Sequence, residues 1–204
     1  VIINDFEVFR PQLIRNGQQE GLTFPNADLI RELNFSSGGF ESKYGDKSSS
    51  VLDIKYKVPD SLRYSIMGSL LGASGHLEGS KKYRKNSPSK INYLLGARYK
   101  TSKYLLSSQD LKGEYQPNFL DLQSYITVDL NTAFQLAFIG NINRSQFKLI
   151  PEESTQAKGS ISFVLKLNAY YEGQEFDYFN QSMGGISLTY LPKNKKHPHF
   201  LKYM

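Results

Sequence analysis

The sequence has no cysteine and no tryptophan, and only three histidines among its 204 residues. Without cysteine the chain cannot form a disulfide scaffold, a thiolate zinc site or a redox dithiol. The few histidines leave little material for imidazole-based metal binding or acid–base catalysis. The formal charge is +6, from 25 Lys and Arg against 19 Asp and Glu, and the basic residues are spread along the chain. Nucleic-acid binders gather such residues on one face, so no nucleic-acid partner is expected.

Long hydrophobic runs are also missing. Two long stretches without a formal charge are Tyr64–Leu77 and Asn131–Asn143, and Gly, Ser or Asn interrupts both. Each is shorter than the about 20 apolar residues that a transmembrane helix needs, which excludes a helical membrane protein. A transmembrane β-barrel stays open, because each of its strands needs only about 9–11 residues of alternating polarity.

Aromatic and small residues are plentiful, with 14 Tyr, 13 Phe and 16 Gly, a mixture that favours strands and turns over helices. Beyond Pro59 apolar and polar residues alternate over long runs. The clearest runs are Ile91–Tyr99, Leu120–Leu130, Thr132–Phe138 and Ile161–Tyr171, with weaker copies at Arg63–Glu78 and Gln181–Tyr190. This period of two predicts strands with one apolar and one polar face. The charged residues expected on the polar, inward face are Arg98, Lys100, Asp121, Asp129 and Lys166.

These runs are longer than the about 5–6 residues of an average globular strand. Leu130–Thr132 predicts a tight turn, whereas Ser80–Lys90 and Leu106–Phe119 are long polar links. Short turns at one end and long loops at the other are typical of an outer-membrane barrel. The alternation by itself also fits a soluble sandwich or a lipocalin-like barrel, in which the apolar face meets a protein core.

The first 58 residues have a mixed pattern. A short helix is predicted at Asn26–Leu33, because Asn26 is a good N-cap and Leu29 and Leu33 form an apolar pair four residues apart. Alternation then predicts a strand at Val51–Lys57, with its apolar residues at the even positions.

Two turns lie between that helix and that strand. Gly38-Gly39 and Gly45-Asp46 mark them, and Tyr44 precedes the second. In this order of elements, Asp28–Ile54 resembles the end of the plug domain of TonB-dependent outer-membrane receptors of the Bacteroidetes type. The opening run Ile2–Val8 is similar to an earlier plug strand of that family. The residues that carry the resemblance, expected to have structural roles in the plug, are Gly38, Gly39, Tyr44, Gly45 and Asp46.

The sequence departs from the family at two turns. Asn4-Asp5 stands where the family commonly has Asp-Gly or Asn-Gly, and Ser49-Ser50 stands where it usually has Gly-Gly. Large transporters of this kind close with about 22 strands, whereas six are predicted here, or seven if His197–Met204 begins another. We therefore expect a piece of a longer receptor, with the end of the plug at 1–58 and the first six or seven barrel strands at 59–204.

The expected fold class is mainly β, the C-terminal part of an α+β plug domain followed by long antiparallel strands of a partial transmembrane β-barrel. The resemblance implies a bacterial outer-membrane location and active uptake of a scarce nutrient, such as a siderophore, cobalamin, glycan or peptide. Its implied partners are TonB, through a segment outside this chain, the nutrient, outer-membrane lipid and a surface lipoprotein. The implied substrate contacts lie in Arg15–Phe24, Ser80–Lys90 and Leu106–Phe119.

Transport makes and breaks no bond in the substrate, so we expect neither enzyme activity nor a cofactor. Gly38-Gly39 lacks the residues of a phosphate loop, and His197-Pro198-His199 offers only two ligands for a metal. Ser48–Ser50 has no nearby histidine and no nucleophile elbow. Lys81–Lys85 is expected to be a solvated extracellular loop able to contact anionic lipopolysaccharide headgroups. The carboxylate pairs, expected to be solvated or to line the lumen, are Asp5/Glu7, Glu152/Glu153 and Glu175/Asp177.

Two other functions stay open from the sequence. A barrel of this family could serve as a structural subunit of a larger outer-membrane assembly, which co-purifying partners would reveal. A soluble β-rich ligand-binding domain is the second, and it predicts a monomer that folds in plain buffer. A lipid-facing stripe of Phe134, Leu136 and Phe138 would prevent that behaviour.

Overall fold

The computed structural model describes residues 1–13, 23–39, 41–45, 47, 49–83, 89–101, 113–115, 118–151, 154–160, 163–169, 173, 175–191 and 201–204. Most of these residues lie in strands, and nearly all strand pairs are antiparallel. The expectation of a mainly β fold is therefore confirmed. Across the described ranges, no helix has the length and apolar character needed to cross a membrane.

A small four-stranded sheet is formed by the first part of the chain. Its strands, in the order β2-β1-β4-β3, are β1 (Ile2–Ile3), β2 (Phe6–Glu7), β3 (Ile30–Ser36) and β4 (Val51–Tyr56). Ile2–Val8 is therefore a hairpin and not one strand. Its two turn residues, Asn4 and Asp5, have φ angles of 48° and 72°. A two-residue hairpin turn with both φ angles positive selects Asn, Asp or Gly, so Asn4-Asp5 can form the turn without glycine.

The helix predicted at Asn26–Leu33 is shorter than expected. The backbone forms one 3-10 turn, η1 (Ala27–Leu29), and the Asn26 side chain accepts a hydrogen bond from the Asp28 amide at 3.2 Å. The N-cap is thus confirmed, but the chain then enters β3, which pairs with β4. Leu29 is buried, whereas Leu33 is 51% exposed. The predicted extent was wrong because pairing with a distant strand outweighs a weak local helix preference. A second 3-10 turn, η2, spans Ser42–Tyr44.

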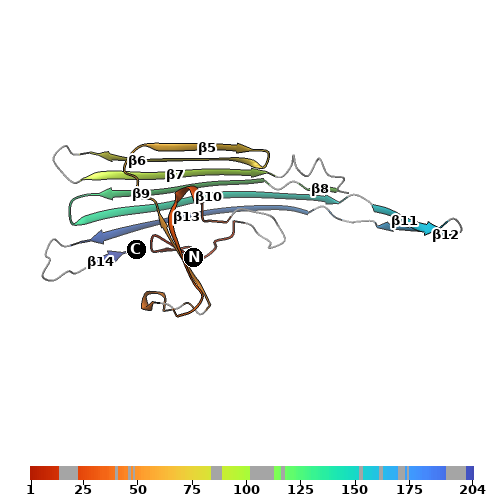
Figure 1. Ribbon diagram of the computed structural model, residues 1–204, viewed down its shortest axis with the longest axis horizontal. Helices are drawn as coiled ribbons and strands as arrows, with labels where there is room; N and C mark the ends of the chain where they lie inside the picture. Colours follow the sequence, from red (N-terminus) through yellow and green to blue (C-terminus); the bar gives the residue numbers. More distant parts are fainter. Residues whose placement is uncertain are drawn as a thin grey trace.

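The rest of the chain forms a large antiparallel sheet (Figure 1). Its strands are β5 (Arg63–Ser69), β6 (Gly72–Lys82), β7 (Lys90–Thr101), β9 (Asn118–Asp129), β10 (Phe134–Pro151), β13 (Glu175–Tyr190) and β14 (Leu201–Tyr203), in the order β14-β13-β10-β9-β7-β6-β5. Long antiparallel strands are confirmed, and β10 and β13 reach 18 and 16 residues, but the run predicted at Ile161–Tyr171 is described as strand only at Phe163–Ala169 and lies outside this sheet. β8 (Gly113–Tyr115) pairs with the far end of β10, and β11 (Ser154–Ser160) and β12 (Phe163–Ala169) form a separate hairpin beyond it.

Tight turns occur at both ends of the large sheet. The predicted turn after Leu130 joins β9 to β10, and the Asn131 side chain caps it by accepting from the amides of Ala133 and Phe134 at 2.7 and 2.9 Å. A second tight turn, which the alternation did not predict, lies at Leu70-Leu71 and divides Arg63–Glu78 into two strands. Leucine has no turn preference, so the alternation there predicts a single strand.

The long links are also divided between the two ends. Lys90 pairs with Asp129, so the link from β6 to β7 shares an end with the 130–133 turn. The link from β7 to β9 lies at the opposite end, with the Leu70-Leu71 turn. The expectation of short turns at one end and long loops at the other was therefore wrong. The ends of β6 and β7 at Lys82 and Lys90 lie at one end of the sheet, whereas the ends of β7 and β9 at Thr101 and Asn118 lie at the other.

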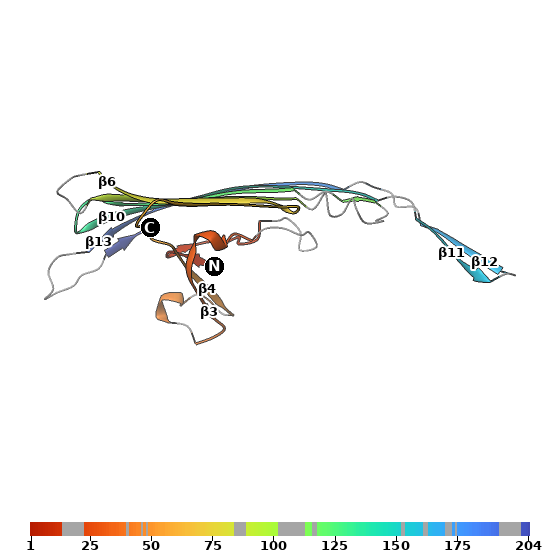
Figure 2. The same ribbon diagram turned by 45° about the horizontal axis from the view of Figure 1, so that its top comes forward.

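The small sheet packs against one face of the large sheet (Figure 2). We call this the covered face, and the opposite one the open face. One buried cluster joins both sheets, and the large sheet contributes Leu94 and Ile139 to it. Two glycines permit the close approach: a Cβ at Gly96 would lie 2.8 Å from Asn26 Nδ2, and a Cβ at Gly185 would lie 2.7 Å from the Phe6 ring.

Candidate functional site

The two faces of the large sheet have opposite polarity. Buried polar residues dominate the covered face: Asn92, Asp121, Gln123, Thr127, Asn141, Asn143, Ser145 and Ser187. Large apolar side chains, between 38% and 61% exposed, occupy the open face: Leu95, Leu122, Phe138, Ile142, Ile186 and Leu188. A sheet in a water-soluble protein has the reverse arrangement, with its apolar face toward the core. The alternation predicted which residues share each face, and the strand register confirms it.

Arg98 on β7 and Asp121 on β9 anchor the small sheet to the covered face. The guanidinium donates to Asp121 Oδ2 through Nε and Nη2, at 2.8 and 2.5 Å, and Asp121 is fully buried. The Nη1 and Nη2 groups of Arg98 also donate to the backbone carbonyls of Thr23, Phe24 and Pro25, at 2.8, 3.3 and 3.0 Å. A buried ion pair is favourable only when its other hydrogen-bonding groups are satisfied, and these carbonyls satisfy the guanidinium.

Two more residues, Gln123 on β9 and Tyr56 on β4, belong to this anchor. The Gln123 side-chain amide donates to the Phe24 carbonyl, and the Tyr56 hydroxyl donates to Gln123 Oε1 at 3.0 Å. Burial raises the pKa of Tyr56, the neighbouring Asp121 carboxylate raises it further, and the Arg98 charge opposes the shift in part. Tyr56 is therefore a hydrogen-bond donor at all pH values at which the fold is expected to persist. The anchor thus holds the Thr23–Pro25 segment through backbone carbonyls and β4 of the small sheet through the Tyr56 hydroxyl.

Beside the anchor, the covered face carries side-chain amides. Asn141 Nδ2 donates to Asp121 Oδ1 at 2.6 Å, and Asn143 Nδ2 donates to the Leu120 carbonyl at 3.2 Å. The side-chain oxygens of Asn141, Asn143 and Gln181 and Oε2 of Glu78 are buried and accept no hydrogen bond from any described residue. Buried polar atoms are seldom left unsatisfied, so these oxygens are the covered-face acceptors still able to bind a donor.

Four of the five residues that carry the resemblance, Gly38, Gly39, Tyr44 and Gly45, are described, and they lie between β3 and β4. Gly38 and Gly39 have φ angles of 138° and 63°, which confirms the turn and explains why glycine suits both positions. Gly45 ends η2 with an ordinary φ of −59°, so its glycine is not needed for the backbone conformation there. Asp46 lies outside the described residues.

Tyr44 connects its turn to the small sheet. Its hydroxyl donates to Asp53 Oδ2 at 2.6 Å, and both side chains are buried. Burial of the phenol and the hydrogen bond to Asp53 both raise the pKa of Tyr44. Asp53 was expected on the polar side of its strand, with Lys55 and Lys57. Sequence alternation missed its burial because the partner that hydrogen-bonds Asp53 Oδ2 lies nine residues away in another element.

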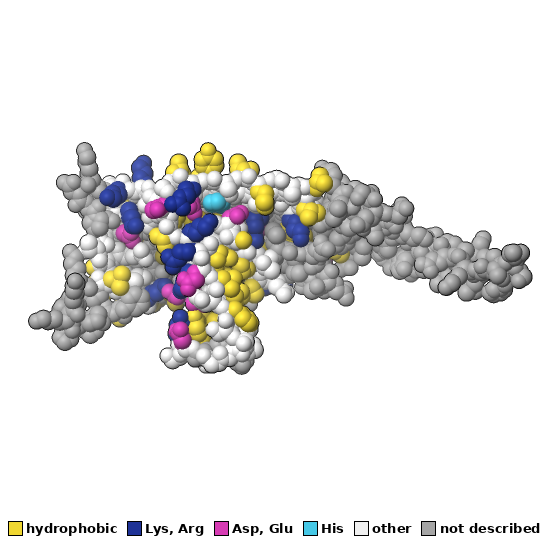
Figure 3. All heavy atoms as spheres, in the orientation of Figure 1, with side chains coloured by type: hydrophobic (Ala, Val, Ile, Leu, Met, Phe, Trp, Pro, Cys, Tyr) yellow, Lys and Arg dark blue, Asp and Glu magenta, His cyan; other side chains and the backbone are white. Residues whose placement is uncertain are grey.

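Charged side chains lie side by side along the small sheet and the adjoining part of the large sheet (Figure 3). Asp5, in the hairpin turn, pairs with Lys55 at 2.8 Å and with Lys202 of β14. Partial burial opposes ionisation of Asp5, but the hydrogen bonds from Lys202 and Lys55 outweigh it and lower the pKa of the carboxyl group. The Lys202 contact fastens an edge strand of the large sheet to the small sheet.

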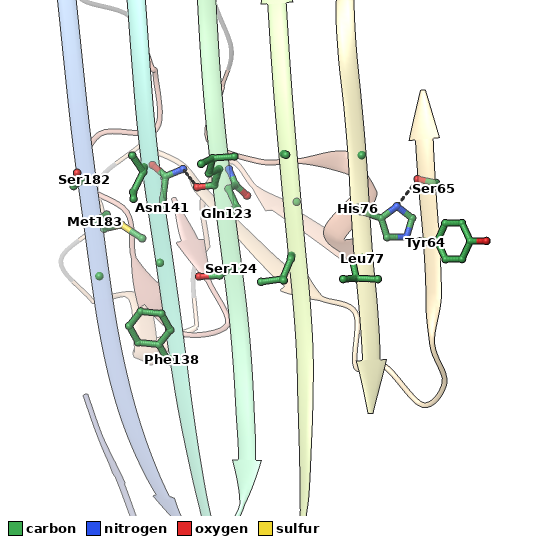
Figure 4. A pocket seen from close by; sticks show the side chains of 18 of the residues that line it. Tyr64, Ser65, His76, Leu77, Gln123, Ser124, Phe138, Asn141, Ser182 and Met183 are labelled. Carbon is green, nitrogen blue, oxygen red and sulfur yellow. Dashed lines mark hydrogen bonds between the residues drawn. The ribbon is translucent and has the colours of Figure 1, made fainter. Parts of the chain in front are cut away.

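The open face has a hollow of about 900 Å³ that crosses six strands, from β5 to β13 (Figure 4). Small residues form its floor on five of these strands: Gly75, Ala97, Ser124, Gly140 and Gly184. Larger apolar side chains, including Leu95, Leu122 and Phe138, stand around it, and no Asp, Glu, Lys or Arg among the described residues lines it. Such a surface can hold an apolar chain, and at its β5–β6 side the Ser65 hydroxyl lies 2.5 Å from His76 Nδ1.

Most of the segments expected to contact substrate lie outside the described residues. From Arg15–Phe24 only Thr23 and Phe24 are described, and both carbonyls bind Arg98. Ser48, His197–His199, Glu152/Glu153 and the end of Lys81–Lys85 are likewise outside. Among the described residues, no group of three or more His, Cys, Asp or Glu side chains could hold a metal ion. Arg98 and Asp121 were expected to face inward, but their contacts with Thr23–Pro25 were not predicted.

No protein-family model, no curated protein and no solved structure matches this chain. The polarity of the two faces and the anchor between the sheets are therefore the evidence for function.

Proposed function

We propose that the chain is part of a TonB-dependent outer-membrane receptor of the Bacteroidetes type. The small sheet would be the end of the plug, and the large sheet would be the first part of the barrel wall. The observation that carries this proposal is the polarity of the large sheet, whose polar face is covered by protein while its apolar face is open. This arrangement costs free energy in water, since the exposed apolar band would remain hydrated, and it suits a sheet whose outer solvent is lipid.

The extent of the apolar band supports a membrane location. On β10 the open-face residues from Phe134 to Ile142 are all apolar or glycine, and Arg144 is the next. Eight residue steps at about 3.3 Å give about 26 Å along the strand, close to the about 25 Å apolar band of outer-membrane barrels. Aromatic side chains stand at both limits, with Tyr190 packed against Phe134 at one end and Tyr99 and Tyr178 at the other.

The contact between the sheets supports a plug that can move. Its polar part consists of hydrogen bonds from Arg98 and Gln123 to backbone carbonyls, which water can replace when the two parts separate. An interface made only of interlocked apolar side chains would be harder to open. In the proposal, energy transmitted by TonB rearranges the plug, and a scarce nutrient such as a siderophore, cobalamin, glycan or peptide passes without any bond being made or broken.

The hollow on the open face is consistent with lipid as a partner. Its floor of small residues and its apolar walls would be filled by acyl chains. A substrate site, in contrast, would be expected on the plug and in the loops at one end of the barrel, which agrees with the absence of charged lining residues in this part of the described surface.

Two measurements on the protein purified from its natural source test the proposal: the intact denatured mass, and the need for detergent. We expect a mass several times that of this chain and loss of the protein from solution when detergent is removed. A monomer with the mass of this chain, soluble in plain buffer, would refute the proposal and leave a soluble β-rich domain. Nutrient uptake by cells carrying the receptor then separates a transporter from a structural subunit of a larger assembly.

A further inference from the structure

Another hollow, of about 120 Å³, lies between the small sheet and the covered face of the large sheet. The hairpin turn, β3, β4 and the Lys57–Pro59 link line one side, and β7, β9 and β10 line the other. Its charged lining residues are Arg31, Lys55 and Lys57, and no Asp or Glu of the described chain lines it. The volume equals that of roughly four water molecules in the liquid, which is enough for a small oxyanion such as phosphate.

The two lysines at this hollow differ in how their charge is balanced. Lys55 pairs with the Asp5 carboxylate at 2.8 Å and lies 3.7 Å from that of Asp53, so its charge is compensated. Lys57 donates to a neutral acceptor, the backbone carbonyl of Asp28, at 2.6 Å. An ammonium has three N–H groups, so Lys57 keeps its full charge and further donors beside the hollow.

A β-bulge places Arg31 at the same hollow. The pairing of β3 with β4 shifts between Ile30 and Glu32, so Arg31 has no single partner residue on β4. Bulges turn a side chain away from the regular alternation and are common beside functional sites. No carboxylate among the described residues forms an ion pair with Arg31, which is exposed. Its guanidinium, with five N–H groups, is therefore available to a ligand.

The large sheet contributes hydroxyl groups from the opposite side of the hollow. Thr127 Oγ1 accepts a hydrogen bond from Asn92 Nδ2 at 2.9 Å, which leaves the hydroxyl hydrogen of Thr127 to donate elsewhere. Tyr125, two residues earlier on the same face of β9, also lines the hollow. A phenol is protonated at neutral pH and can donate as well. The hollow thus combines two cations that lack a carboxylate partner with donors from a second sheet.

We propose that this hollow binds a small oxyanion such as phosphate, held by Arg31 and Lys57 on one side and by hydroxyls of β9 on the other. A guanidinium binds two phosphate oxygens through parallel hydrogen bonds, and an ammonium adds a second positive charge. Because its ligands come from both sheets, the anion adds a contact between them beside the Arg98 anchor. This inference goes beyond the proposed function and does not depend on it, since protein surfaces form both sides of the hollow.

Thermal unfolding and isothermal titration calorimetry of the full chain, in detergent where the chain requires it, test the proposal. The probes are sodium phosphate, sodium sulfate and sodium chloride at equal ionic strength. We expect phosphate and sulfate to raise the unfolding temperature saturably and chloride to have no such effect, because only a ligand of the folded state stabilises it in this way. Arg31→Gln should weaken phosphate binding about tenfold, and Tyr125→Phe should weaken it about fivefold.

Arg144→Gln is the matched control. Arg144 is also exposed, but it lies on the open face of β10, so the change removes the same charge away from the hollow and should leave phosphate binding unchanged. Absence of saturable phosphate binding, equal stabilisation by chloride, or an equal loss in Arg144→Gln would each overturn the inference.

A lipid headgroup is the other source of phosphate, and dioleoylphosphatidylglycerol in mixed micelles distinguishes it from the free anion. We expect this lipid not to compete with inorganic phosphate, because the hollow lies on the covered face. Competition that Arg31→Gln abolishes would assign the site to a lipid and overturn the inference. Loss of phosphate binding in a chain that still inserts into lipid vesicles would leave the proposed function standing.

Discussion

The small sheet and the large sheet bury opposite kinds of side chain. The small sheet and the segments around it bury Ile3, Val8, Leu13, Phe24 and Ile54, as a water-soluble domain does. The large sheet buries mostly amides, hydroxyls and carboxylates on its covered face and leaves its apolar face open. One part of the chain therefore buries its apolar side chains and the other exposes them. This difference marks where a protein interior ends and the proposed lipid environment begins.

The largest expected effect comes from the anchor. Arg98→Met would leave the fully buried Asp121 without its cation, and breaking such a pair costs about 3–5 kcal/mol. We expect thermal unfolding in detergent to show a loss of this size. Lys100→Met, two residues along the same face, should change stability by less than about 0.5 kcal/mol. If Arg98→Met with Asp121→Leu were no more stable than Arg98→Met alone, the unpaired carboxylate would not be the cause.

Two exposed leucines test whether the sheets face different solvents. Leu95→Lys would place a charge in the middle of the apolar band, at a cost of about 2–4 kcal/mol if lipid surrounds it. Leu33→Lys on the small sheet, where the side chain is also exposed, should cost less than about 0.5 kcal/mol. Urea unfolding from lipid vesicles measures both. Equal costs would mean that the two leucines meet the same solvent and would contradict the comparison.

Two neighbouring glycines on β13 offer a more local test. A side chain at Gly185 would collide with the Phe6 ring, whereas a side chain at Gly184 meets nothing within 4 Å. Gly185→Leu should therefore destabilise the contact between the sheets by about 1–3 kcal/mol, while Gly184→Leu should be nearly neutral. Thermal unfolding of the two variants under one condition compares them. A similar loss in both would show that the small sheet does not press on the covered face at this point.

The smallest effect concerns acid stability. The pKa of Asp5 is lowered in the folded protein below its unfolded value of about 3.8. Its ion pairs therefore contribute stability above that pH and lose it as the pH falls through the folded pKa. Because Asp5 is about half exposed, we expect roughly 0.5 kcal/mol. Asp5→Asn should remove this part of the pH dependence of the unfolding free energy and leave the Lys47–Glu7 ion pair intact. If the unfolding free energy of the variant fell below pH 4 as steeply as that of the parent protein, the Asp5 ion pairs would not be the cause.

Local patterns predicted much of the fold. Alternation placed Leu95 and Leu122 on one face and Arg98 and Asp121 on the other, because successive strand residues always point to opposite sides. The turn at Asn131 was also predictable from a residue that caps turns with its side chain. Local patterns failed at Leu33, because its strand conformation depends on pairing with the distant strand β4. They also failed at Leu70-Leu71, because leucine has no preference for turns.

The sequence by itself determined the long strands, the two faces of each strand and the small-residue turns, because these follow from the period of the backbone and from conformational preference. Only the tertiary structure decided that the polar face is the covered one. That decision depends on Thr23–Pro25, whose carbonyls reach Arg98 from more than 70 positions away, and on the space left by Gly96 and Gly185. Such contacts leave no trace in a local pattern, since neither partner's neighbours in the chain show what lies opposite in space.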